Sequence, residues 1–433
     1  MGRKIFMTFL GTSKYEKCNY IFLGEKVNNV VYVQEAICRI LCKDWNENDR
    51  IIVFLTDEAR KSNWISSSNN NGMGLKPTLE NLHLKAKIED VSIPTVESMD
   101  DLKELFDIVF DKFLSDDEVF IDITHSFRMI PFIVSSIVNF ATVVKNITVS
   151  GIFYGAIEAL GPLQQIPNMD IEDRNVFVIN LNYFNTLNNW ALGADEFVRL
   201  GNAQKICEMA YNHVKPLLAE SKGQDEAAKQ IKQIGDMLNL FTQNILTSRC
   251  KEIMYEFDYT RLKSLIEELG EPLIRPFGPL IDYVYKEIRP YKDKSIFNGF
   301  LAVGWCIKHN LIQQGYTILL ETLISFIIYQ VFKDINIIWD LDTRELVNMA
   351  VRIKSENKPF DEWREKAKKN KAKILLIMEY LDSELLSKIN TLITRRNDIN
   401  HCGCREDCTT PERLKNTLKK IYDEILKLVS SQQ

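Results

Sequence analysis

Short apolar runs alternate with amphipathic segments over residues 1–184. Runs of β-branched and aromatic residues between polar turns are typical of buried strands. They predict strands at residues 5–10, 20–23, 29–33, 51–55, 91–93, 119–123, 147–154 and 176–181. Apolar positions three and four residues apart predict helices at 34–43, 78–86, 99–114 and 129–144. Because most strands alternate with helices, we expect a parallel, doubly wound sheet, with a hairpin around Gly24.

The periodicity becomes helical from about residue 185 and stays so to the end of the chain. Long amphipathic or apolar helices are predicted at residues 187–209, 227–246, 294–310 and 311–332. Prolines are concentrated between residues 270 and 290 and indicate a kinked connector. The pattern therefore predicts an α/β domain followed by an all-α region.

Composition narrows the class of protein. A chain of 433 residues is too long for one core, so two or three domains are expected. No apolar run reaches the roughly 18 residues of a membrane span, and no signal-peptide pattern precedes the first strand, so we expect no membrane partner. Cysteines on apolar helix faces suit reduced thiols and a cytoplasmic location. A net charge of −5 indicates no global affinity for nucleic acid, so any such contact needs a local patch.

The most informative stretch is residues 119–131, where a predicted strand ends in Thr124, His125, Ser126 and Arg128. Pro131 follows in the first turn of an apolar helix, where its missing N–H is harmless. The free N–H groups of a helix start favour an anion. We therefore expect a phosphate group here. In the alternative interpretation, Asp122 and Thr124 only cap the helix and His125 is a core residue.

Other predicted strands also end in small polar residues. The first strand runs into Gly11, Thr12, Ser13, Lys14 and Tyr15, and further strands end at Thr56 and Gly155. Parallel strands bind ligands outside their carboxyl ends, so these positions are predicted to converge on one site. The spacing matches neither G-x-G-x-x-G nor a P-loop, which argues against an ordinary dinucleotide or ATP-hydrolysing site.

A second candidate site lies near residue 400. On a helix, Asn397 and His401 share one face with Arg396 adjacent. Phosphodiester transfer without a metal needs such groups, since His can move the proton of a ribose 2′-hydroxyl and Arg can stabilise charge on phosphorus. Asn397 could orient the phosphate or the imidazole. The alternative is a helix end whose His and Arg complement the dipole.

A zinc site is a rival for the same region, because Cys and His are zinc ligands. The candidate ligands would be His401, Cys402, Cys404 and Cys408. Their spacings differ from those of the usual zinc knuckles, and no second pair is near. We therefore expect no resident metal.

These motifs resemble those of two known modules. The first 180 or so residues resemble the CARF domain of the Asp-x-Thr-His-Gly family of CRISPR-associated proteins; the matching segments are Gly11-Thr12-Ser13 with Tyr15, Gln34-Glu35-Ala36, Asp122-Ile123-Thr124-His125-Ser126-Phe127-Arg128 and Tyr154-Gly155-Ala156. Ser126 stands where the family has glycine. Arg396-Asn397-x-x-x-His401 resembles the Arg-x4–6-His motif of HEPN ribonucleases, and the helix at 311–332 is similar to the family's helix before that motif.

The resemblance implies a Rossmann-like CARF domain at residues 1–184, a helical linker at 185–294 and a HEPN domain at 295–433. It implies a type III CRISPR ancillary endoribonuclease that cuts single-stranded RNA without a metal cofactor and leaves a 2′,3′-cyclic phosphate. Its allosteric activator would be a cyclic oligoadenylate of four or six units, and we expect cyclic tetra-adenylate. Two chains would share this ring across a twofold axis and form a composite HEPN site, in a homodimer or higher oligomer.

Two further functions follow from the same motifs. Thr12, Ser13, Thr124 and His125 could open the ring slowly, as a ring-nuclease side activity. The alternative to a ribonuclease is a nucleotide-sensing CARF protein that regulates transcription or a partner, with a helix-turn-helix within residues 187–246.

Overall fold

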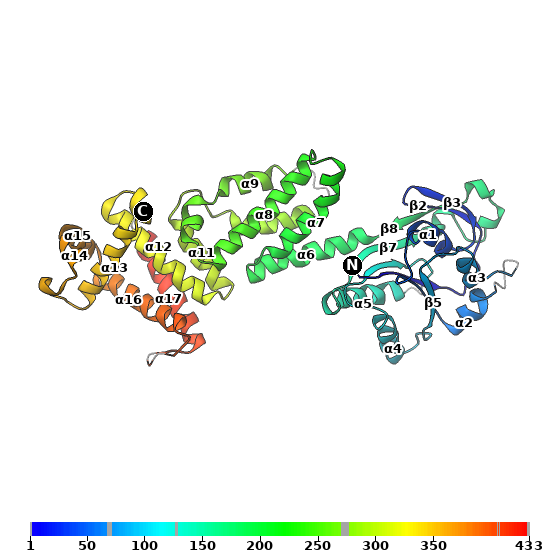
Figure 1. Ribbon diagram of the computed structural model, residues 1–433, viewed down its shortest axis with the longest axis horizontal. Helices are drawn as coiled ribbons and strands as arrows, with labels where there is room; N and C mark the ends of the chain where they lie inside the picture. Colours follow the sequence, from blue (N-terminus) through cyan, green and yellow to red (C-terminus); the bar gives the residue numbers. More distant parts are fainter. Residues whose placement is uncertain are drawn as a thin grey trace. The chain divides into compact units, whose positions relative to one another are not determined.

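The computed structural model describes residues 2–66, 72–125, 129–269, 277–404, 406 and 408–430. The chain forms two compact units, Met1–Thr186 and Leu187–Gln433, and the boundary falls within one helix. The first unit contains a sheet with helices and the second is mostly helical (Figure 1). The prediction of an α/β part followed by an all-α part is therefore confirmed. The assignment of these parts to CARF and HEPN modules, and the division at residue 294, stay predictions.

The first unit is built on an eight-stranded sheet of order β3-β2-β8-β7-β6-β1-β4-β5. The strands are β1 (Lys4–Leu10), β2 (Cys18–Phe22), β3 (Glu25–Val30), β4 (Arg50–Leu55), β5 (Lys87–Ser92), β6 (Glu118–Asp122), β7 (Thr148–Gly155) and β8 (Asn175–Asn180). The five strands from β7 to β5 in this order are parallel. Strand β8 is antiparallel to β7, and β3 is antiparallel to β2.

The prediction of a parallel, doubly wound sheet with one hairpin is therefore wrong at β8, which pairs antiparallel with β7. A parallel return needs a crossover of a dozen or more residues, usually a helix. Between β7 and β8 the chain makes only short 3₁₀ turns, at Ile157–Leu160, Ile166–Asn168 and Ile171–Asp173, and β8 returns antiparallel. The predicted hairpin is present as β2 and β3, and Gly24 turns it at a φ of 81°.

Helices cover both faces of this sheet, because side chains alternate between the faces of a strand. They are α1 (Val33–Leu41), α2 (Asp57–Ala59), α3 (Leu75–Glu80), α4 (Met99–Phe110) and α5 (Ile130–Val144). On β1, Phe6 and Leu10 join a core with α1 and α3, whereas Ile5, Met7 and Phe9 join a second core with α4 and α5 (Figure 1). The sheet is therefore the middle layer of three.

The second unit consists of packed helices that share one hydrophobic core. They are α6 (Asn182–Leu200), α7 (Gln204–Glu220), α8 (Glu226–Leu246), α9 (Tyr259–Glu267), α10 (Phe277–Ile288), α11 (Phe297–Lys308), α12 (Ile312–Phe332), α13 (Leu341–Ser355), α14 (Glu365–Lys369), α15 (Lys371–Tyr380), α16 (Ser383–Asn400) and α17 (Pro411–Ser430). The single helix predicted at 187–209 is two helices, because Gly201 breaks it at a φ of 71°. A Cβ at Gly201 would lie 2.7 Å from the Trp305 Nε1 atom, so this turn also needs a glycine for space.

Helix α12 is the centre of this core, with most of its residues from Gly315 to Ile328 buried. Within the part of the chain that the structure describes, it is the one helix long and apolar enough to cross a membrane, with a mean hydropathy of 1.5 over its most apolar window. By this measure the expectation that no segment reaches such a length does not hold. However, 67% of that window is buried inside the protein, so its composition is that of a core helix.

The close contact between α11 and α12 gives a first prediction. A Cβ at Gly299 would lie 2.2 Å from the Thr322 Oγ1 atom, and Thr322 is fully buried and stiff at χ1. We expect Gly299→Ala to lower the free energy of unfolding of this unit by about 1–3 kcal/mol through overpacking. Hydrogen exchange of α11 and α12 peptides measures the loss. The double variant Gly299→Ala/Thr322→Ala should recover part of it, and equal protection in Gly299→Ala and the unaltered protein would contradict the packing argument.

Candidate functional site

Four predicted ligand-binding positions follow neighbouring strands of the sheet. Gly11 follows β1, Thr56 follows β4, Thr124 lies two residues beyond β6, and Gly155 ends β7. These strands are adjacent in the order β7-β6-β1-β4 and run parallel. Their carboxyl ends therefore meet at one edge, where open α/β sheets bind ligands. Ser126 and Arg128 lie outside the described residues.

The buried carboxylate of Asp122 is the centre of a hydrogen-bond network that links β1, β6 and β7. The Thr8 hydroxyl on β1 donates to Asp122 Oδ2 at 2.7 Å, and the Thr124 hydroxyl donates to Asp122 Oδ1 at 2.5 Å. The Thr124 backbone N–H also donates to Oδ1, and the Gly155 N–H of β7 donates to the Thr124 hydroxyl at 2.8 Å. Asp122 is fully buried, and this burial raises the pKa of its carboxyl group. The Thr124 hydroxyl is thus used inside the fold, where it joins β6 to β7.

The loop after β1 is held in place by hydrogen bonds between side chains and its backbone groups. The Gly11 N–H donates to the Tyr15 hydroxyl at 2.9 Å, and the Asn63 side-chain amide donates to the carbonyls of Gly11 and Ser13 at 3.0 and 3.1 Å. A Cβ at Gly11 would lie 3.2 Å from the His125 carbonyl oxygen, a tight contact that a larger residue could make only if the neighbouring chain shifted by a few tenths of an ångström. The sequence patterns did not indicate Asn63, because it lies in a short π-helical segment, Arg60–Trp64, and not at a strand end.

Three predicted residues of this loop point to solvent. The side chains of Thr12, Ser13 and Lys14 are exposed, and Lys14 forms an ion pair of 2.8 Å with Glu16. Hydroxyl and ammonium groups in this position can donate to phosphate oxygens. These three side chains are therefore the exposed hydrogen-bond donors of the candidate site, which a ligand can reach.

Tyr15 and Thr56 are buried and form contacts within the protein. The Tyr15 ring is 4% exposed and packs against Tyr32 and His125, with ring centroids 4.9 and 4.4 Å apart. Burial raises the pKa of its hydroxyl, which stays protonated. The Thr56 hydroxyl accepts a hydrogen bond of 3.3 Å from the Ala59 N–H and caps α2. Both residues shape the strand ends.

His125 carries a buried nitrogen that has no hydrogen-bond partner among the described residues. This atom is Nε2, and the imidazole ring lies edge-on to Tyr15. Burial lowers the pKa of His125 to about 4, so the ring is neutral at physiological pH. Buried polar atoms are normally paired, so the unpaired Nε2 is a candidate partner for a ligand that displaces the groups covering it.

In the second unit, the predicted catalytic residues lie on the last turns of α16. Asp382 is the N-cap of α16, and its side chain accepts the Leu385 N–H at 2.7 Å. It ends in a Schellman motif, in which Cys402 and Gly403 have φ of 55° and 71° and their N–H groups donate to the carbonyls of Ile399 and Asp398. His401 occupies the C-cap and is exposed. Asn397 lies one turn earlier on the same face.

Arg396 points to another side of α16, where its guanidinium group faces the carboxylate of Glu321. At 3.6 residues per turn its direction differs by about 140° from that of His401. Its Nη1 lies 3.8 Å from Glu321 Oε1 on α12, and the other oxygen of Glu321 binds Arg344 of α13 at 2.6 Å. The Arg396 side chain is 34% exposed, and its Nε is buried without a partner among the described residues. Among these residues, the Arg396 and His401 side chains form no hydrogen bond or ion pair with each other.

The loop after α16 is tied back to the helix. Asp398 is buried, and its carboxylate accepts the Thr409 N–H at 3.0 Å. Cys402, Cys404 and Cys408 are exposed free thiols. Within the described parts of the chain, no three His, Cys, Asp or Glu side chains lie close enough together to hold a metal ion.

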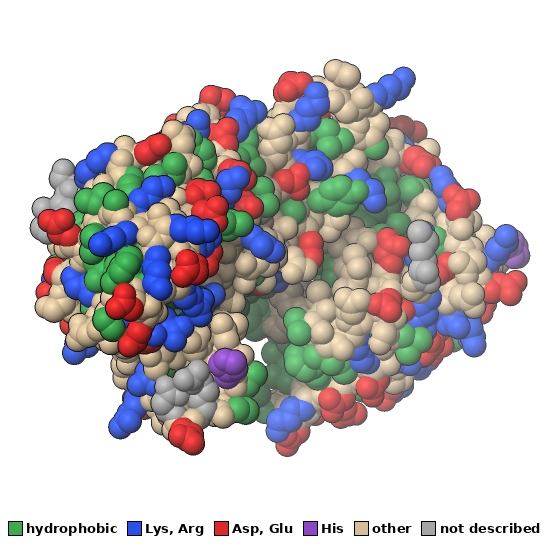
Figure 2. All heavy atoms as spheres, turned by 60° about the vertical axis from the view of Figure 1, so that its left-hand side comes forward, with side chains coloured by type: hydrophobic (Ala, Val, Ile, Leu, Met, Phe, Trp, Pro, Cys, Tyr) green, Lys and Arg blue, Asp and Glu red, His purple; other side chains and the backbone are tan. Residues whose placement is uncertain are grey.

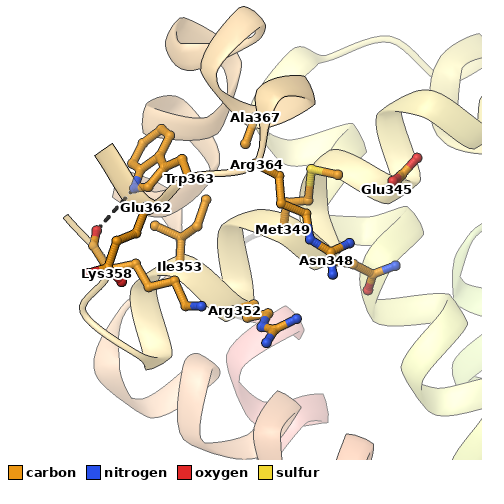
Figure 3. A pocket seen from close by; sticks show the side chains of 10 residues that line it. All are labelled: Glu345, Asn348, Met349, Arg352, Ile353, Lys358, Glu362, Trp363, Arg364 and Ala367. Atoms are coloured by element: carbon orange, nitrogen blue, oxygen red, sulfur yellow. Dashed lines mark hydrogen bonds between the residues drawn. The ribbon is translucent and has the colours of Figure 1, made fainter. Parts of the chain in front are cut away.

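Basic and acidic side chains are interspersed over the visible face of the helical unit (Figure 2). Figure 3 shows a pocket of about 410 Å³ at α13 and residues 358–367. Its cations include Arg352 and Lys358, which both pair with Glu356, at 2.9 and 2.7 Å. Their charges are thus offset within the fold.

Comparison with known proteins gives a distant relative. No family model matches the chain. The chain is similar to the CRISPR-associated protein MJ1674 of Methanocaldococcus jannaschii, with 24% identity over 233 residues, which are 52% of this chain. The match spans 31% of the length of that relative. This likeness supports an association with CRISPR systems, whereas the CARF and HEPN assignments stay predictions.

The Asp122 network gives the second prediction. Thr124→Val keeps the shape of the side chain but leaves the Gly155 N–H without its acceptor. We expect the strand ends to lose about 1–3 kcal/mol of stability, the cost of an unsatisfied buried group. Hydrogen exchange of β6 and β7 peptides measures this loss. Thr12→Val, at an exposed position of the neighbouring loop, is the matched control, and equal exchange rates in the two variants would show that the network contributes nothing.

Proposed function

We propose that this chain is a metal-independent endoribonuclease of type III CRISPR defence that a cyclic oligoadenylate activates. The likeness to a CRISPR-associated protein supports the CRISPR-related role at its coarser level. The arrangement of α16 carries the proposed activity. An exposed His401 ends this helix, Asn397 lies one turn before it, and the partly exposed Arg396 has unsatisfied donors.

These three side chains suit RNA cleavage by the 2′-hydroxyl. His401 takes the 2′ proton, the 2′ oxygen attacks phosphorus, and the bond from phosphorus to the 5′ oxygen breaks. The leaving 5′ oxygen takes a proton from the imidazolium of His401, which becomes neutral again, and the products are a 2′,3′-cyclic phosphate and a 5′-hydroxyl. Arg396 stabilises the charge on the phosphoryl oxygens, and Asn397 orients the phosphate or the imidazole. Every step uses groups of this chain and the RNA.

A second copy of the chain would complete the site. On one α16 the Arg396 and His401 side chains diverge, so two copies of the helix facing each other would offer an Arg and a His to one phosphate. In the first unit, α5 exposes Phe132, Phe140 and Val143, with exposed fractions of 80%, 50% and 84%. Contiguous exposed apolar residues are typical of an interaction surface. These observations support the proposed homodimer.

The activator would bind at the sheet edge of the first unit. A cyclic oligoadenylate offers several phosphates to the exposed donors of Thr12, Ser13 and Lys14, and the neutral His125 Nε2 supplies one more hydrogen bond. A symmetric ring across a twofold axis needs only half of these contacts from each chain. Cyclic tetra-adenylate is the ring that we propose. Slow opening of this ring by Thr12, Ser13, Thr124 and His125 is a proposed side activity.

The role of His401 gives the third prediction. We expect His401→Ala to lower the rate of RNA cleavage about 10²–10⁴-fold, the usual contribution of a general acid or base. Its affinity for labelled cyclic tetra-adenylate should be unchanged, because that ligand binds the other unit. Asn400→Ala, which shortens an exposed neighbour on the same helix, controls for damage to the helix end. Undiminished cleavage by His401→Ala would remove the proposed mechanism.

The pKa of His125 gives the fourth prediction. Because this pKa is about 4, the ring stays neutral as pH falls from 8 to 5.5, and the affinity for cyclic tetra-adenylate should be constant over this range. Protonation would add a cation and strengthen binding only as pH falls toward 4. Calorimetric titrations at several pH values test this, with His125→Gln as the variant that cannot titrate. An affinity change centred near pH 6.5 in the unaltered protein alone would show that the ring is not buried as described.

A further inference from the structure

A groove runs along the face of α16 that ends in Asn397 and His401. Its volume is about 490 Å³, and its lining residues on α16 include Ser383, Ser387, Asn390 and Thr394. These positions are separated by four, three and four residues, so they form one stripe along the helix. Asn397 and His401 continue the same spacing. The stripe spans roughly 16 Å from Ser383 to Thr394, at about 1.5 Å per residue.

The lining has the chemistry of an anion-binding surface. It contains two cations, Lys354 and Arg395, and no carboxylate among its nine residues. The Lys354 ammonium donates to the carbonyls of Met378 and Leu381 at 2.5 Å each, which fixes its charge at the groove wall. The remaining polar groups are hydroxyls and an amide, which can donate to phosphate and ribose oxygens.

The two carboxylates of α16 have partners of their own. Glu384 forms an ion pair of 3.0 Å with Lys388, and Asp398, three residues after Arg395, accepts the Thr409 N–H at 3.0 Å. By contrast, the pocket in Figure 3 includes Glu345 and Glu362 in its lining. A further hollow of about 810 Å³ includes Asp334. Of these three hollows, the groove on α16 suits a polyanion best.

We propose that this groove binds the sugar–phosphate backbone of the RNA substrate on one side of the scissile phosphate. This inference rests on the proposed ribonuclease function and assigns the substrate path to a surface. Hydroxyls, an amide and two cations contact backbone atoms, and the lining contains no aromatic side chain on which a base could stack. The groove therefore holds a few nucleotides with little regard to base identity and directs the chain toward His401.

The test places a negative charge in the groove. Ser387 is exposed and lines the groove, so Ser387→Glu should repel the RNA backbone, whereas Ser387→Gln adds similar bulk without charge. Asn416→Glu makes a comparable charge change at an exposed position of α17 outside the groove lining. With cyclic tetra-adenylate present, Ser387→Glu should raise the KM for a twelve-nucleotide RNA roughly fivefold, as expected for one charge near a phosphate. Both other variants should match the unaltered protein.

Two further measurements separate the possible causes. A dinucleotide too short to reach the groove should be cleaved equally by all four proteins. In the His401→Ala background, fluorescence anisotropy should show the same roughly fivefold loss of affinity for the longer RNA. An equal KM for Ser387→Glu and Asn416→Glu would overturn the groove while the ribonuclease function stands. A change of oligomeric state in Ser387→Glu, seen by light scattering, would instead assign the groove to a contact between chains and overturn the proposal.

Absence of RNA cleavage by the unaltered protein with any cyclic oligoadenylate would overturn the proposed function. The groove proposal would fall with it, unless the His401→Ala anisotropy still showed the charge-dependent loss. That last result would support RNA binding by the groove in a protein that does not cut RNA.

Discussion

The buried carboxylate of Asp122 is the interaction on which the first unit's site depends. It accepts hydrogen bonds from Thr8 on β1 and from Thr124 beyond β6, and Thr124 in turn accepts the N–H of Gly155 on β7. An unpaired carboxylate in this position would be very costly, so the strand ends are held where its partners can reach it. The loop of residues 11–15 and the His125 ring are built on this fixed edge.

The helical unit uses a shared carboxylate for a similar purpose. Glu321 lies between the guanidinium groups of Arg344 and Arg396, with one oxygen toward each. The carboxylate reduces the repulsion between the two cations and leaves donors of Arg396 unsatisfied. Burial raises the pKa of the nearby Cys250 thiol to about 12, so this thiol adds no charge. Arg396 is thus positioned by α12, whereas His401 is positioned by the C-cap of its own helix.

Local patterns predicted much of the fold because most elements follow from periodicity. The strands at 51–55 and 147–154 and the helices at 227–246 and 311–332 differ from the observed elements by only one or two residues at each end. Pairing partners do not follow from periodicity, and the antiparallel β8 was therefore missed. The break at Gly201 was missed because one glycine within an apolar pattern is usually tolerated.

The sequence likewise predicted some features of the candidate site and not others. The strand ends that carry Gly11, Thr124 and Gly155 were predicted from spacing, and the structure brings them to one edge. Spacing could not predict that the Thr124 hydroxyl forms its hydrogen bonds with Asp122 and the Gly155 N–H within the fold. Nor could it predict that Glu321 faces Arg396, since these residues are 75 positions apart and meet only through helix packing.

Helices α7 and α8 lie in the region where the alternative function, transcriptional regulation, predicts a helix-turn-helix. They have 17 and 21 residues and pack along buried faces, with Gly235 so close to Ala210 that a Cβ at this glycine would lie 2.9 Å from the alanine Cβ. A helix-turn-helix joins its two helices at a steep angle through a short turn. The close approach shows that the two helices pack against each other, and the DNA-reading alternative stays a prediction.

We propose that a ligand at the sheet edge controls cleavage by α16. The most direct measurement is the turnover of a fluorescent single-stranded RNA in EDTA, with and without each cyclic oligoadenylate. The account predicts slow turnover without ligand and a large increase with one ring size, of which cyclic tetra-adenylate is expected. Turnover that no cyclic oligoadenylate changes, or that EDTA abolishes, would contradict it.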